Sequence, residues 1–207
     1  MSTRSRRRSS RGAGESDAVK NWLFDPLTPF CADILCVDPP SDFENYSAAG
    51  ETKGPRAQYA TMSDDEIAAL PVGDLASGDA WFFLWATAPK LPTNLIWLKK
   101  WGFKFVTMIV WHKVTAAGKN AVGCGYVARS MQEPVLIGKV GSPPYRTALP
   151  GILPGVRREH SRKPEEFYAA VDRFADPGAR KVDLFARQSR RGWVAWGNER
   201  TKFDPPE

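Results

Sequence analysis

Short apolar stretches alternate with amphipathic ones along the chain from about residue 30 onward. Apolar runs bounded by turn residues indicate strands. By this criterion strands are expected over residues 32–37, 80–86, 104–111, 134–140, 181–186 and 193–196. The run ADILCV is apolar almost throughout and is followed by Asp38-Pro39-Pro40, which is typical of a buried strand.

Amphipathic segments between these strands predict three helices. Ser63 and Glu66 have the spacing of a capping box, so a short helix should follow Ser63. A second helix is expected over residues 92–101, and a third over residues 163–174 with Ser161 as its N-cap.

Strands that alternate with helices favour an α/β fold, with a mostly parallel sheet covered by helices on both faces. Residues 113–130 are rich in Gly and Ala, and residues 141–162 contain four prolines, so both segments are expected to be loops. Most of the eight tryptophans lie inside predicted elements, where core packing explains them better than ligand stacking does. These are Trp81, Trp85, Trp97, Trp101 and Trp111.

Composition narrows the class of protein. The 207 residues are 43% hydrophobic and 25% charged, which excludes wholesale disorder and fits one domain. The longest apolar run, Ala80 to Ala88, is too short to cross a bilayer, and the Arg- and Ser-rich start lacks the apolar stretch of a secretory signal. We therefore expect a soluble, cytoplasmic protein without a membrane partner. Three cysteines without a CxxC pair and two histidines predict no metal site.

The net charge of +6 comes mostly from one end of the chain. Residues 1–14 hold five arginines and no acid, which leaves 24 basic against 23 acidic residues, or +1, in the remainder. We expect a disordered basic tail over 1–14, a domain over 15–200 and a C-terminal tail over 201–207. The basic tail is either a phosphate-binding arm or a solubilising extension.

A second group of basic residues falls within the predicted domain and suits a polyanionic partner, although a solvated charged face has the same pattern. It comprises Arg157, Arg158, Arg162, Lys163, Arg180, Lys181, Arg187, Arg190 and Arg191.

Asp38, Pro39 and Pro40 directly follow the first predicted strand. Ligands of open α/β sheets bind beyond the carboxyl ends of the strands. A carboxylate there can accept hydrogens of an exocyclic amine, and prolines add rigidity without a competing N–H. Taken alone, the three residues favour a simple turn that ends a strand over a binding site.

Further motifs in the sequence favour an amine-binding site at Asp38 over a simple turn. VDPPSDFENYSAAG, AQYATM, WFFLWATAP, REHSRKPEEFY, DLFARQSRRGW and WGNE occur in this order. Together they resemble the adenine N6-methyltransferases related to the catalytic subunit of the eukaryotic messenger-RNA methylase, particularly the short bacterial and phage members. The resemblance runs from about Ala32 to Glu199, and REHSRKPEE is among its more specific signatures.

The resemblance implies a single Rossmann-like methyltransferase domain with permuted motif order that uses S-adenosylmethionine. Asp38 and Pro39 would bind the target amine, within the catalytic tetrapeptide that Pro40 and Ser41 complete, and Asp38 would also lie close to the cofactor. Lys163 would pair with the cofactor's carboxylate. The remaining implied cofactor contacts are Asn198 and Glu199 at the ribose and Arg187 in the same pocket. Asp183 either orients Arg187 or is a charge on an edge strand. Ser189 and Arg190 line the cofactor in relatives, and Arg190 is also a candidate substrate contact.

Ser41 departs from the family pattern, in which an aromatic residue stacks on the adenine. Loss of a stacking ring costs about 1–3 kcal/mol per base in nucleic-acid binders. Either Phe43 or Tyr46 supplies the ring, or the site has decayed and the chain only binds cofactor or nucleic acid. The otherwise complete cofactor set favours an active enzyme.

The expected substrate is adenine in DNA, since the chain resembles the short DNA enzymes; an RNA adenine methyltransferase is the alternative. Sequence specificity would come from residues 118–129, from residues 141–158, or from a homodimer or partner subunit.

Overall fold

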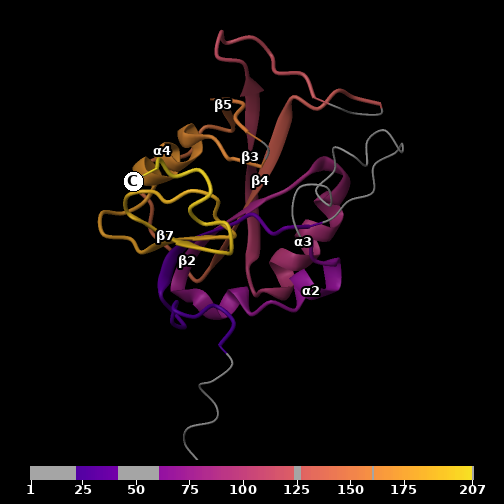
Figure 1. Cartoon of the computed structure of the whole chain (residues 1–207). Helices are drawn as coiled ribbons and strands as arrows, with labels where there is room; N and C mark the ends of the chain where they lie inside the picture. Colours follow the sequence, from indigo (N-terminus) through magenta and orange to yellow (C-terminus); the bar gives the residue numbers. More distant parts are fainter. Residues whose placement is uncertain (1–21, 42–60, 124–126, 160, 207) are drawn as a thin grey trace, which may run out of the picture.

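A seven-stranded sheet forms the centre of the molecule in the computed structural model, which describes residues 22–41, 61–123, 127–159 and 161–206 (Figure 1). The strands are β1 (Ala32–Val37), β2 (Ala76–Trp85), β3 (Lys104–Val114), β4 (Gln132–Val140), β5 (Ile152–Val156), β6 (Lys181–Leu184) and β7 (Trp193–Trp196). Their order is β5-β3-β4-β2-β1-β6-β7. Only β4 runs antiparallel to its neighbours, which confirms an α/β fold with a mostly parallel sheet.

Helices cover both faces of this sheet, as predicted. They are α2 (Asp64–Ala68), α3 (Leu91–Lys100) and α4 (Glu165–Phe174), together with the short 3-10 helices η2 (Val72–Leu75) and η3 (Ala88–Lys90). Ser63 and Glu66 form the predicted capping box of α2. In Figure 1, α2 and α3 lie side by side, away from α4.

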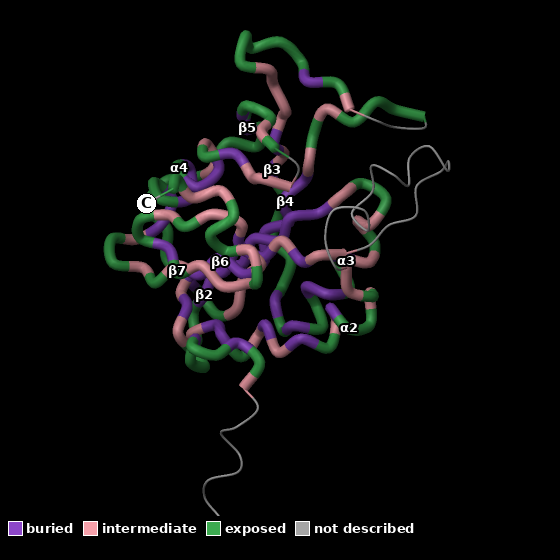
Figure 2. The backbone as a smooth tube through the Cα atoms, in the orientation of Figure 1, coloured by how far each residue is buried: buried purple, intermediate pink, exposed green. Residues whose placement is uncertain are grey.

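Two hydrophobic cores result, one on each face of the sheet. Side chains alternate along β1, so that Leu35 and Val37 pack with residues of α2 and α3, while Ile34 and Cys36 pack with residues of α4. The buried segments therefore run through the middle of the molecule in Figure 2, with exposed segments around them. This packing on both faces fixes β1 between β2 and β6, so that its carboxyl end lies where the parallel strands end.

The prediction of a loop over residues 141–162 was wrong, because strand β5 lies within it. Pro154 and Gly155 concealed this strand, since both residue types are unfavourable inside a sheet. Among the described strands, β5 pairs with β3 alone and ends the sheet, and a proline is tolerated on such an edge strand.

The prediction of Ser161 as a helix N-cap was also wrong. Pro164 occupies that position, and α4 starts at Glu165 without a side-chain cap. Ser161 instead has a φ of 61°, in the left-handed region, within the turn that leads to Lys163.

The predicted basic tail over residues 1–14 lies outside the described residues. Near the other end, the Phe203 N–H donates to the Arg187 carbonyl at 3.0 Å, and the Asp204 carboxylate accepts from the Ser189 N–H at 2.7 Å. In the described part of the chain, no helix has the length and apolar character needed to cross a membrane.

Candidate active site

A cavity of about 250 Å³ opens beyond the carboxyl end of β1. Residues after β1 and β2, residues of β3, β4 and α3, and the loop before α4 line it. Asp38, Pro39 and Ser41 enter it from the turn after β1. The structure thus places the predicted tetrapeptide where ligands of α/β sheets bind.

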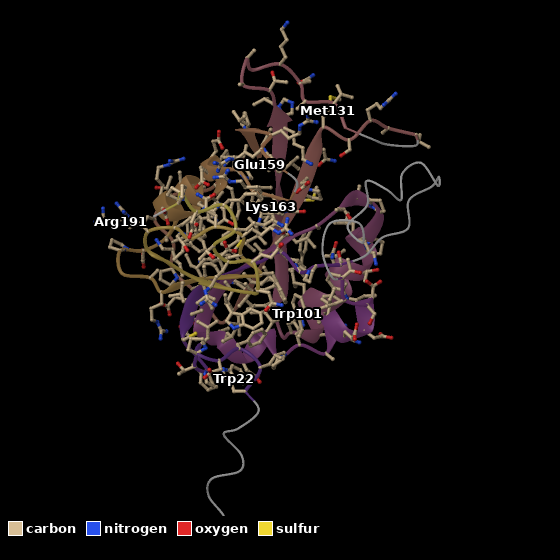
Figure 3. The ribbon with its side chains drawn as sticks, viewed as in Figure 1. Trp22, Trp101, Met131, Glu159, Lys163 and Arg191 are labelled. Atoms are coloured by element: carbon tan, nitrogen blue, oxygen red, sulfur yellow. The ribbon has the colours of Figure 1, made fainter. Side chains whose placement is uncertain are left out.

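Lys163 connects this turn to the rest of the cavity. Its ammonium lies 3.1 Å from Asp38 Oδ1, 3.1 Å from Glu133 Oε2 and 4.8 Å from the centre of the Trp85 ring. Figure 3 shows Lys163 near the middle of the molecule. Burial alone would lower its pKa, but the two carboxylates outweigh burial and raise it, so Lys163 stays positively charged.

Glu133 is a site residue that the sequence did not reveal. It lies at the start of β4, opposite Trp111 of β3. Glu133 also forms an ion pair with Lys113, with 2.5 Å between Lys113 Nζ and Glu133 Oε1. Burial would raise its pKa, but Lys163 and Lys113 outweigh burial and lower it. Glu133 directly precedes the strand expected over residues 134–140, and nothing in that pattern marked it as a site residue.

The tetrapeptide itself is held by its backbone. The Ser41 N–H donates to the Pro39 carbonyl at 2.7 Å, and the Met62 N–H donates to the Pro40 carbonyl at 2.9 Å. Burial raises the pKa of Asp38 even though Lys163 acts in the opposite direction. Asp38 is therefore a more basic carboxylate than an exposed aspartate.

A second, smaller cavity of about 10 Å³ adjoins the first and shares Asp38 and Lys163 with it. Asp183, Arg187 and Arg190 line this second cavity. The structure thus groups most of the predicted cofactor residues beside the predicted catalytic residue.

Asp183 is a buried residue of β6, only 3% exposed, and not a charge on an edge strand. The Tyr168 hydroxyl donates to its carboxylate at 2.9 Å, and Arg190 Nη1 lies 3.5 Å away. Burial is the main cause that raises its pKa to about 7. Asp183 therefore contacts Tyr168 and Arg190, whereas the residue that it was expected to orient is Arg187.

Arg187 forms an ion pair with Glu199, which also pairs with Lys202 at 2.6 Å. Asn198, next to Glu199, is exposed. The predicted ribose pair therefore lies beside Arg187 but outside the two cavities described above. Phe43 and Tyr46, the predicted sources of a stacking ring, lie outside the described residues.

Acidic partners neutralise most of the basic group over residues 157–191. Of its nine members, only Arg157 and Arg191 have no ion pair with the residues that the structure describes. Arg157 lines the larger cavity, whereas Arg191 projects from the outside of the molecule (Figure 3).

A sequence model of the MT-A70 family matches residues 32–199, and the chain belongs to that family. This confirms the resemblance inferred from the motifs and accounts for the Rossmann-like methyltransferase domain.

Several curated proteins are similar to the chain. A putative N(6)-adenosine-methyltransferase MT-A70-like protein of Medicago truncatula is 32% identical over 87% of this chain and 28% of its own length. The N(6)-adenosine-methyltransferase catalytic subunit METTL3 of Homo sapiens is 27% identical over 80% of this chain and 28% of its own length. The type II methyltransferase M.MunI of Mycoplasma sp is 30% identical over 69% of this chain and 60% of its own length. The chain thus spans little more than a quarter of the plant and human relatives.

Proposed function

We propose that this protein is an S-adenosylmethionine-dependent methyltransferase that methylates the exocyclic N6 amine of adenine in DNA. The observation that carries the proposal is the position of Asp38, which lies at the carboxyl end of β1, borders a cavity and pairs with Lys163, whose side chain is only 12% exposed. The names of the similar proteins support methylation of adenine at N6. Similarity to a type II methyltransferase favours DNA.

The residues beside Asp38 fit the proposed cofactor chemically. The Lys163 ammonium suits the cofactor's carboxylate, and the neighbouring acids Asp38 and Asp183 suit its ammonium group. Arg187 and Glu199 offer a donor and an acceptor for ribose hydroxyls. When bound, the cofactor supplies a methyl group activated by a sulfonium.

Asp38 would hold the target amine during transfer. Its carboxylate accepts an N6 hydrogen, and the Pro39 carbonyl, which bonds to Ser41 through one lone pair, retains the other for the second hydrogen. Held in this way, the nitrogen lone pair faces the methyl group, and orientation supplies much of the rate advantage. The cofactor would supply the methyl group to N6 as its sulfur departs, and Asp38, whose raised pKa suits it as an acceptor, would take the N6 proton.

The location of Asp38 also implies that the base leaves its stack. A residue on the wall of a cavity cannot reach N6 inside a duplex, so the adenine must be flipped out. The most readily methylated DNA should therefore be DNA in which the target adenine is unpaired or mismatched.

The test is transfer of a radiolabelled methyl group from S-adenosylmethionine to unmethylated double-stranded DNA, single-stranded DNA and RNA, followed by nucleoside analysis. We expect label in N6-methyldeoxyadenosine. Label in another nucleoside, or on none of the three polymers, would overturn the proposal.

Two alternatives rest on specific observations. The relatives named N(6)-adenosine-methyltransferases favour RNA, and label in N6-methyladenosine would identify that substrate. Ser41 in the tetrapeptide favours a degenerate protein, and calorimetric binding of S-adenosylmethionine without transfer would identify it.

The human relative is named a catalytic subunit, so a homodimer or a complex with a partner subunit is the alternative to a monomer. Light scattering on the protein used in the transfer assay would show whether it is a monomer or a homodimer.

A further inference from the structure

Three residues on the wall of the larger cavity each have a buried polar atom without a hydrogen-bond partner among the described residues. One atom is Trp85 Nε1, at the end of β2. The other two are Asn94 Oδ1, from the first half of α3, and Thr87 Oγ1, from the segment that links β2 to α3. Both residues line the same cavity as Asp38. Asn94 is only 2% exposed, so bulk solvent does not satisfy its amide oxygen.

Asn94 occupies a position where the helix pattern calls for an apolar residue. Trp97 and Leu98, three and four residues later on the same face, are each 1% exposed and belong to the hydrophobic core. A buried polar group without a partner destabilises the folded state, and native proteins almost always satisfy such groups. An amide at this position is therefore explained best by a ligand that enters the cavity and bonds to it.

The surroundings of Asn94 indicate the kind of ligand. Trp85 and Trp111 line the same cavity and pack edge to face, with ring centres 6.0 Å apart, so the cavity offers apolar surface to a flat ring. Ser41, also on its wall, is small and leaves the space open. The cavity thus combines aromatic surface, an amine-binding carboxylate at Asp38 and an unpaired amide.

We infer that Asn94 reads the edge of the target adenine and is a specificity-determining residue, with Thr87 as a second polar contact. The amide nitrogen can donate to a ring nitrogen of the adenine, N1 or N7, and the amide oxygen can share the N6 hydrogen that faces the Pro39 carbonyl in a three-centre hydrogen bond, which leaves the other N6 hydrogen to Asp38. Asparagine pairs with adenine in this bidentate way in the DNA major groove. The inference rests on the proposed function and adds base recognition through hydrogen bonds to it.

The first test compares Asn94→Leu with Trp101→Phe. Trp101 Nε1 is also buried and unpartnered, near the other end of α3, but Trp101 does not line the cavity. Both substitutions remove an unpaired polar group from the same helix region. Asn94→Leu fills the space with apolar atoms and should melt at or above the wild-type temperature, whereas Trp101→Phe also loses packing against Phe82 and should melt somewhat lower. Only Asn94→Leu should lower kcat/KM for DNA, by about tenfold or more, the loss expected for a hydrogen bond to the base. Thr87→Val, which is nearly isosteric, should show a smaller loss and serves as a second variant if Asn94→Leu fails to fold.

The second test measures base recognition without transfer. Calorimetry on protein loaded with S-adenosylhomocysteine compares binding of adenosine, 1-deazaadenosine and 7-deazaadenosine. We expect the wild type to bind one deaza analogue about tenfold more weakly than adenosine, and Asn94→Leu to bind all three alike. A folded Asn94→Leu protein with wild-type kcat/KM, or with wild-type discrimination among the three nucleosides, would overturn the inference. A wild type that discriminates the nucleosides but methylates no polymer would overturn the proposed function and leave the role of Asn94 standing.

Discussion

The ammonium of Lys163 lies 3.1 Å from the carboxylate of Asp38 and so joins the turn after β1 to the loop before α4. Burying a charge is costly unless a partner of opposite charge accompanies it. Lys163 has two such partners, Asp38 in the turn after β1 and Glu133 on β4. One cation therefore fixes two carboxylates at the edge of the cavity, and loss of any member changes the environment of the others.

We expect Asp38→Ala to reduce methyl transfer by about 10²-fold or more, because the variant can neither orient the amine nor accept its proton. The fold should persist, since Lys163 keeps Glu133 as a partner. Calorimetry should still detect cofactor binding, and the radiolabel assay measures the loss. Transfer near the wild-type rate would remove Asp38 from the mechanism.

Lys163→Met should weaken cofactor binding by about 10- to 100-fold, the loss expected for a hydrogen bond between charged groups. The matched control is Lys113→Met, because Lys113 also pairs with Glu133 and also lines the larger cavity but has no proposed cofactor contact. Calorimetric titration with S-adenosylmethionine compares the two variants. Equal losses in both would show that Lys163 acts only by neutralising Glu133.

The positions of Asp38 and Lys163 could be anticipated because each lies in a short motif with a local structural meaning. A carboxylate that ends a buried strand must lie at the ligand-binding edge of the sheet, whatever the rest of the fold does. Apolar runs bounded by turn residues predicted six of the seven described strands, although β6 includes the acidic Asp183.

Glu133 and Asn94 could not be anticipated, because long-range packing gives them their meaning. Glu133 meets Lys163 only through the pairing of β4 with β3 and the return of the chain before α4. Asn94 looks like an ordinary polar residue of an amphipathic helix until α3 docks and buries it. Strand β5 was missed for a local reason, since Pro154 and Gly155 mask an edge strand that packing on β3 stabilises.

Asp183 makes stability depend on pH in a defined direction. Its pKa rises from 3.8 to about 7 on folding, so the folded state holds the proton more tightly than the unfolded state does. The favourable contribution of this residue is present below about pH 4 and is lost as the pH rises towards 7.

Asp183→Asn keeps an acceptor for the Tyr168 hydroxyl but cannot ionise. Relative to the wild type, its free energy of unfolding should increase by about 2–3 kcal/mol between pH 5 and pH 7. Urea denaturation at both pH values measures this difference, and Asp172→Asn, at an exposed ion pair with Lys181, is the control. A constant difference at the two pH values would contradict the raised pKa.

Arg157 is the candidate phosphate contact at the entrance to the site. It lines the cavity and, among the described residues, has no acidic partner, so its charge is available to a polyanion. Arg157→Ala should weaken DNA binding to a similar degree for every sequence and reduce the slope of log affinity against log salt by about 0.9. Fluorescence anisotropy with labelled duplexes over a range of salt concentrations measures both quantities.

Arg191→Ala is the control that distinguishes a phosphate contact at Arg157 from the effect of the protein's net charge. Arg191 also lacks an acidic partner among the described residues, but it lies on the outside of the molecule, away from Lys163 (Figure 3). Both variants lose one positive charge, so general electrostatic attraction predicts equal effects. A contact next to the cavity predicts a change in affinity and salt slope for Arg157→Ala alone, because only a phosphate held at that position releases its counterion there. Equal effects in the two variants would reduce the role of Arg157 to its contribution to net charge.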